Sequence, residues 1–137
     1  MDVFDIRILS FLGFVSALML AVGMQLVNRI SPNNAAIRSW TMGATLHAVG
    51  YTVIYLRGLL PLPPLFFILI LNAVIVMGGA QIYFGLRQYL GLAIGFRWDV
   101  PLTALSVVSA FFFTAVMVSL THRVVVSSVI LFVLYGL

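Results

Sequence analysis

Seven arginines and three aspartates are the only charged residues of the chain, and they separate long runs of apolar residues. The chain is 64% hydrophobic and 7% charged over its 137 residues, whereas soluble domains carry about 25% charged residues. So few charges cannot cover the surface of a water-soluble enzyme, and disordered chains have the opposite composition, with low hydrophobicity and high charge. The sequence therefore predicts an integral membrane protein whose main partner is the lipid bilayer.

The apolar runs match the length of membrane-spanning helices, which need about 20 predominantly apolar residues. We predict an all-α fold, a polytopic transmembrane helix bundle of about five spans in which residues 1–137 form a single domain. The predicted spans cover residues 8–28, 39–56, 65–86, 102–120 and 124–137. Polar or Pro-rich stretches separate them, at residues 29–34, 61–64, 87–101 and 121–123.

The two ends of the chain carry separate expectations. The fifth predicted span, residues 124–137, holds only about 14 residues, which is short for a bilayer crossing. It is apolar to its last residue, so we expect the chain to be cut inside a longer protein; a short final helix is the alternative. The N-terminus carries Asp2 and Asp5 rather than a positive leader, so we expect the first span to remain as an anchor.

The arginines predict the orientation, because loops on the inner side of a membrane are enriched in basic residues. With the N-terminus outside, the inner loops hold Arg29, Arg38, Arg87 and Arg97, and the outer side holds Arg7, Arg57 and Arg123. The arginines stand singly rather than in a patch, which argues against nucleic acid as a partner.

No charged residue lies in the middle of a predicted span. Ion-coupled transport generally needs a titratable group at depth, and a retinal Schiff base needs a lysine, which the sequence lacks. The sequence also has no cysteine, no Gly-rich phosphate loop and no Ser/His/Asp constellation. We therefore predict no catalytic residue, no metal site and no cofactor in this chain.

His47 is the one titratable side chain predicted at depth, near the middle of the second span. Residues spaced around it by three or four positions share its helix face, and two of them are glycines, which let membrane helices approach closely. At 1.5 Å per residue, His47 lies about 15 Å from the membrane face at the turn between the second and third spans. Asn72 in the third span lies about 12 Å from the same face. We predict a contact between His47 and Asn72, direct or through water. The candidate ligand or helix-contact residues are His47, Asn72, Gly43, Gly50, Trp40 and Arg57.

Three interpretations of His47 stay open. A hydrogen bond between helices is the first, because polar side chains often link membrane helices in this way. A ligand or proton-sensing role is the second, and a haem or metal site is the third, although a single deep histidine without cysteine is a poor ligand set. We expect His122 to lie in a solvated loop, and the repeat of Gly13, Ala17 and Ala21 to form a packing seam.

The second and third predicted spans share a pattern with a known family. The pattern comprises Arg38-x-Trp40, Gly50, Leu56-Arg57-Gly58-x-Leu60-Pro61, Asn72 and Gly85-Leu86-Arg87-x-Tyr89-x-Gly91. It resembles the N-terminal membrane region found ahead of GGDEF domains in many bacterial diguanylate cyclases. Tyr89 stands where that family usually has Phe. The resemblance covers residues 38–91.

The resemblance implies a signal-input and anchoring domain in the bacterial inner membrane and a homodimeric parent. In that membrane the outside N-terminus predicted from the arginines would be periplasmic. The chain contains no GGDEF sequence, so it is not itself expected to be an enzyme; synthesis of cyclic di-GMP would belong to the parent. An unidentified small ligand is a further expected partner. The alternatives are a stand-alone transporter or channel subunit, and a structural subunit of a membrane complex.

Overall fold

The computed structural model describes residues 3–57, 61, 63–92, 99–116 and 119–136, and every regular element in these ranges is helical. The all-α prediction is therefore confirmed. The elements are α1 (Val3–Ile30), α2 (Ala35–Leu56), α3 (Pro64–Tyr89), α4 (Asp99–Phe111), a π-helical turn η1 (Phe112–Val116) and α5 (Leu120–Gly136).

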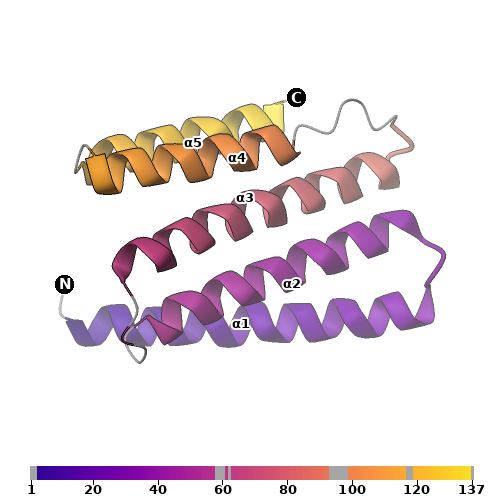
Figure 1. The fold of residues 1–137 in the computed structure, drawn as a ribbon. Helices are drawn as coiled ribbons and strands as arrows, with labels where there is room; N and C mark the ends of the chain where they lie inside the picture. The colour runs from indigo at the N-terminus through magenta and orange to yellow at the C-terminus, as the bar shows by residue number, and fades with distance from the viewer. Residues whose placement is uncertain (1–2, 58–60, 62, 93–98, 117–118, 137) are drawn as a thin grey trace.

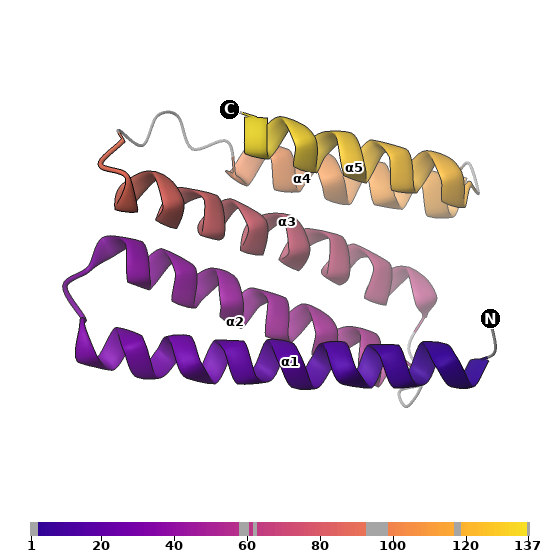
Figure 2. The ribbon, with the colours of Figure 1, turned by 180° about the vertical axis from the view of Figure 1, so that it is seen from behind.

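Successive helices run in opposite directions and pack mainly on their neighbours in the chain (Figures 1 and 2). The order across the molecule is α1, α2, α3 and then the pair of α4 and α5, both of which contact α3. The turn from α1 to α2 and the C-terminal end of α3 lie at the same end of the molecule, and α5 runs toward that end (Figure 1). Helix α1 forms one edge of this arrangement.

Local sequence signals explain where α2 and α3 begin. The side-chain oxygen of Asn34 accepts hydrogen bonds from the backbone N–H groups of Ala36 (3.0 Å) and Ile37 (3.2 Å), as an N-cap does. Pro64 occupies the first turn of α3, where its missing N–H costs nothing. The turn predicted at 29–34 overlaps the break between α1, which ends at Ile30, and α2, which begins at Ala35. In the turn predicted at 61–64, residue 62 lies outside the described residues and Pro64 already belongs to α3.

The C-terminal third of the chain differs from the prediction in detail. The helix predicted over residues 102–120 begins at Asp99 and changes to a π-helix at Phe112. The stretch predicted as a loop at 121–123 belongs to α5, because the Ser119 hydroxyl accepts a hydrogen bond from the backbone N–H of His122 (3.3 Å) and so caps the helix. The expectation that His122 lies in a loop is wrong.

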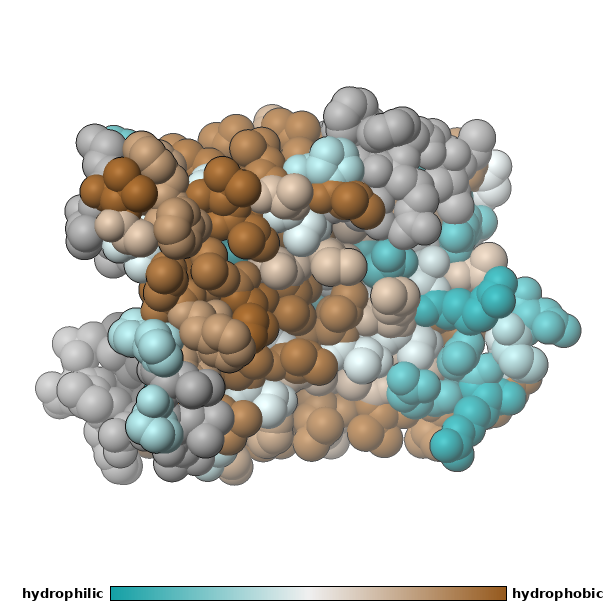
Figure 3. Space-filling view, in the orientation of Figure 1, coloured by the Kyte–Doolittle hydropathy of each residue, from teal (hydrophilic) through white to brown (hydrophobic). Residues whose placement is uncertain are grey.

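Two described helical segments are long and apolar enough to cross a membrane, Ile8–Ile30 and Pro64–Tyr89, and Val100–Val116 is a shorter apolar helix. Large apolar side chains are exposed on all five α-helices. In Figure 3 apolar residues cover much of the visible face, and the hydrophilic residues gather mainly at the end that carries the α1–α2 turn.

Two apolar clusters hold the helices together. The cluster between α1 and α2 consists of small side chains: Ala17, Ala21, Ala44 and Ala48. Its α1 members are two of the residues predicted as a seam, and the third, Gly13, faces the Tyr51 ring of α2. The cluster among α3, α4 and α5 consists mostly of larger side chains: Val76, Ala80, Phe84, Leu102 and Ile130.

Candidate functional site

Helices α2 and α3 approach closely at glycines. A Cβ atom added at Gly43 would lie 2.9 Å from the backbone oxygen of Gly78 and 2.7 Å from a side-chain carbon of Ile82. Both distances are far below an ordinary carbon contact, so only glycine fits at this position. Gly43 therefore lies directly in the contact between the two helices.

His47 lies one turn further along α2 and packs over Gly78. Its Nδ1 atom is 2.9 Å from the carbonyl oxygen of Gly43, one turn earlier in the same helix. A Cβ atom at Gly78 would lie 2.6 Å from this same Nδ1 atom. His47 thus contacts α3 by ring packing on a glycine, and its hydrogen bond stays within α2 rather than joining two helices.

Asn72 faces a different neighbour. Its Nδ2 group donates to the carbonyl oxygen of Ile68 (2.8 Å), and its Oδ1 atom accepts a hydrogen bond from the Ser127 hydroxyl of α5 (3.2 Å). The predicted contact between His47 and Asn72 is therefore not formed. The reason is the register of the antiparallel pair: His47 lies opposite Gly78, which is six residues beyond Asn72 and about 9 Å further along the helix axis.

Trp40 links α2 to the last turns of α3. Its indole Nε1–H donates to the carbonyl oxygen of Ile82 (3.2 Å), and its ring lies against Gly85 and 5.7 Å, centroid to centroid, from the Tyr89 ring. Arg57 lies at the opposite end of α2, where it is exposed and its backbone N–H closes the helix. The predicted residues of α2 therefore lie in three places: Trp40 near its N-terminal end, Arg57 at its C-terminal end and His47 in its central region.

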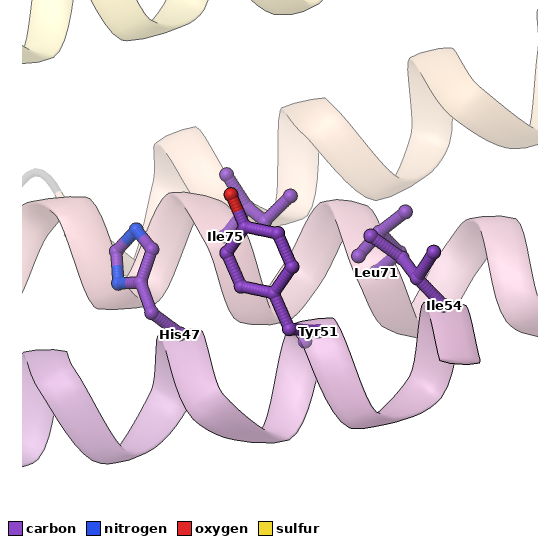
Figure 4. Close-up of a pocket in the computed structure, with 6 residues that line it drawn as sticks. His47, Tyr51, Ile54, Leu71 and Ile75 are labelled. Carbon is purple, nitrogen blue, oxygen red and sulfur yellow. The ribbon is translucent and has the colours of Figure 1, made fainter. Parts of the chain in front are cut away.

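A cavity of about 230 Å³ lies between α2 and α3 beside His47. Its lining, shown in Figure 4, consists of His47, Gly50, Tyr51, Ile54, Leu71 and Ile75. A Cβ atom at Gly50 would meet Leu71, Val74 and Ile75 at 3.7 to 3.8 Å, which is ordinary contact. Gly50 therefore leaves room beside α3, so of the two glycines predicted at a close helix contact, Gly43 forms it and Gly50 does not.

Tyr51 is a polar residue of the cavity lining that the predicted candidate set did not include. Its ring packs on Gly13 of α1. In Figure 4 the ring leans toward His47. Side chains on a helix point back toward its N-terminus. The ring of Tyr51 therefore extends toward the middle of α2. The four-residue spacing between His47 and Tyr51 was the available signal.

The site brings two polar side chains into an otherwise apolar cavity. Within the part of the chain that the structure describes, no group of three histidine, cysteine, aspartate or glutamate residues gathers as a metal site would require. The arrangement suits the binding of a small molecule through hydrogen bonds. No protein-family model matches this chain, and neither a curated protein nor a solved structure matches it.

Proposed function

We propose that this chain is a multi-pass domain of the bacterial inner membrane that anchors a diguanylate cyclase and passes a signal to it. The observation that carries the proposal is the packing of the family-like pattern. Trp40, near the start of the pattern, contacts Gly85 and Tyr89, which come near its end. These three residues of the resemblance thus share one contact between α2 and α3, whereas Asn72 contacts α5.

The membrane setting is supported by the distribution of apolar surface. Exposed apolar side chains run along helices of membrane-spanning length, while exposed arginines such as Arg29, Arg38 and Arg57 lie at helix ends. Burying such a surface in lipid removes apolar area from water, at about 25 cal/mol per Å². We propose about five spans, with the shorter α4 and η1 forming one of them.

The charge distribution supports an N-terminus in the periplasm. Arg29 and Arg38 flank the α1–α2 turn, and Arg87 lies in the last turn of α3 at the same end of the molecule. Basic residues favour the cytoplasmic side. Helix α5 runs toward this same end, which would deliver a following domain to the cytoplasm, where GTP is available.

Single cysteines test the orientation, since these 137 residues contain none. We expect Pro61→Cys to react with an impermeant thiol reagent in intact cells, and Asn33→Cys to react only after the cells are opened. Labelling of position 33 and protection of position 61 in intact cells would show that the orientation is the opposite of the one proposed.

The reading frame beyond codon 137 tests the proposed function. We expect it to continue into a GGDEF domain, and we expect the membrane fraction containing the full protein to convert GTP to cyclic di-GMP. The protein should also cross-link as a dimer. A stop codon without a catalytic domain would overturn the proposal and favour a stand-alone membrane subunit.

A further inference from the structure

We propose that the cavity between α2 and α3 binds a neutral, lipid-soluble molecule with a hydroxyl group on a single ring, and that His47 and Tyr51 hold this hydroxyl. The inference deepens the proposed function, because it names the ligand class of an input site, and it rests on the proposed membrane setting. A ring hydroxyl occurs both in free phenols and in the reduced head groups of quinone-like lipids.

The size and lining of the cavity fit one substituted ring. The cavity measures about 230 Å³, and an apolar protein cavity of about 150 Å³ accepts benzene. Its apolar lining comes from Ile54 of α2 and from Leu71 and Ile75 of α3, and the absent side chain of Gly50 leaves the space open. The lining contains no charged side chain, which disfavours an ionic ligand.

The two polar side chains offer complementary hydrogen bonds. The carbonyl oxygen of Gly43 can only accept, so the Nδ1 atom of His47 donates to it, and Nε2 of the neutral ring is then an acceptor. The Tyr51 hydroxyl forms no hydrogen bond with any residue that the structure describes, and it can donate. A single guest hydroxyl can therefore donate to His47 and accept from Tyr51.

The position of Tyr51 gives such a guest a route from the bilayer. Tyr51 lines the cavity and is 38% exposed, and its ring lies against Gly13 of α1. Polar groups without a partner are costly in an apolar medium. A guest that satisfies both the hydroxyl and the imidazole would therefore bind better than a hydrocarbon of the same shape.

Histidine NMR of the full chain in detergent micelles provides a direct test. The chain has two histidines, so selective ¹⁵N labelling reports on His47, with His122 of α5 as the internal reference. We expect 4-hexylphenol to shift the His47 ring signals to saturation and to leave His122 unchanged. Hexylbenzene, which lacks the hydroxyl, should produce little shift. A comparison with p-cresol then separates the two sources: equal affinity indicates a free phenol, and tighter binding of 4-hexylphenol indicates a lipid-like head group.

Substitutions of the cavity-lining residues locate the binding. We expect Tyr51→Phe to weaken 4-hexylphenol roughly fivefold, because it removes one hydrogen bond. Gly50→Leu should fill the cavity and abolish the saturable shift, and Gly50→Ala, which fits in ordinary contact, should keep it. Should Gly50→Leu fail to fold, Ile75→Phe fills the same space from α3.

The proposal is overturned if the shift of His47 does not saturate, if hexylbenzene shifts it equally, or if the folded cavity-filling variant binds as before. These outcomes are independent of the reading-frame test. A failed titration removes the ligand site and leaves the anchoring role, whereas a frame without a catalytic domain removes that role and leaves the ligand site.

Discussion

The contact between α2 and α3 and the contact of α3 with the α4–α5 pair are built from opposite kinds of residue. Helices α2 and α3 meet at Gly43 and Gly78, where added side chains would collide with backbone or with the His47 ring. Around Phe84, by contrast, α3 meets α4 and α5 through large side chains that fill the space between helices. The first contact depends on missing side chains and the second on side chains that are present, so opposite substitutions should weaken them.

The largest effect is expected from Phe84→Ala in the second contact. Phe84 is 7% exposed and packs in the cluster that joins α3, α4 and α5. Truncation of a buried phenylalanine costs about 3–5 kcal/mol, and thermal unfolding in detergent measures the loss. Phe66→Ala is the control on the same helix, because Phe66 is 51% exposed. Equal losses for the two variants would mean that side-chain packing does not hold the α4–α5 pair.

A smaller loss is expected from Gly43→Ala in the first contact. The added methyl group would lie 2.9 Å from the backbone oxygen of Gly78, and backbone cannot move aside cheaply. We expect a loss of about 1–3 kcal/mol, as for other overpacked sites. The matched control is Gly50→Ala on the same helix, where the methyl meets only ordinary contacts. If the two variants melt alike, the close approach at Gly43 is not what holds α2 to α3.

The same division explains how much of the fold follows from the sequence. Apolar runs of spanning length predict the first three helices, and the four-residue repeat of Ala17 and Ala21 predicts a seam that the structure contains. Both signals are local to one helix. The change to a π-helix at Phe112 has no such signal. Ser119 is a residue type favoured at N-caps, but it lies within an apolar run, so the start of α5 was not predicted there.

The site was less predictable, because its geometry depends on how two helices slide past each other. Periodicity placed His47 and Gly43 on one face, and the structure has both against α3. It gave no register, so the predicted pairing of His47 with Asn72 depended on depth counted from the turn, whereas the structure pairs Asn72 with Ser127. That count assumed that the end of α2 and the start of α3 lie at the same depth, whereas the residue opposite His47 lies about one helical turn further into α3 than the count implies.

A third prediction concerns the buried hydroxyl of Ser106 on α4, in the part of the molecule where α4 packs on α3. Its side chain is fully buried, and within the described residues its Oγ atom has no hydrogen-bond partner. A buried hydroxyl without a partner is destabilising, so we expect Ser106→Ala to raise stability by about 1 kcal/mol. Ser109→Ala is the control, because the Ser109 hydroxyl donates to the Ser106 carbonyl oxygen (2.9 Å). This variant should be slightly less stable than the parent protein. A drop in melting temperature for Ser106→Ala would show that the hydroxyl has a stabilising partner after all.

The smallest effect concerns the polar link between α3 and α5. The Ser127 hydroxyl donates to Asn72 Oδ1 at 3.2 Å, and such bonds between membrane helices contribute about 0.6 kcal/mol on average. A double-mutant cycle of Asn72→Leu and Ser127→Ala should return a coupling free energy of this size, measured by unfolding in detergent. The cycle of Asn72→Leu with His47→Leu should return none, because the structure places these two residues apart. Coupling between positions 47 and 72, without coupling between 72 and 127, would restore the register expected from helix depth. It would then place Asn72 in the first contact, on the side of α3 that faces α2.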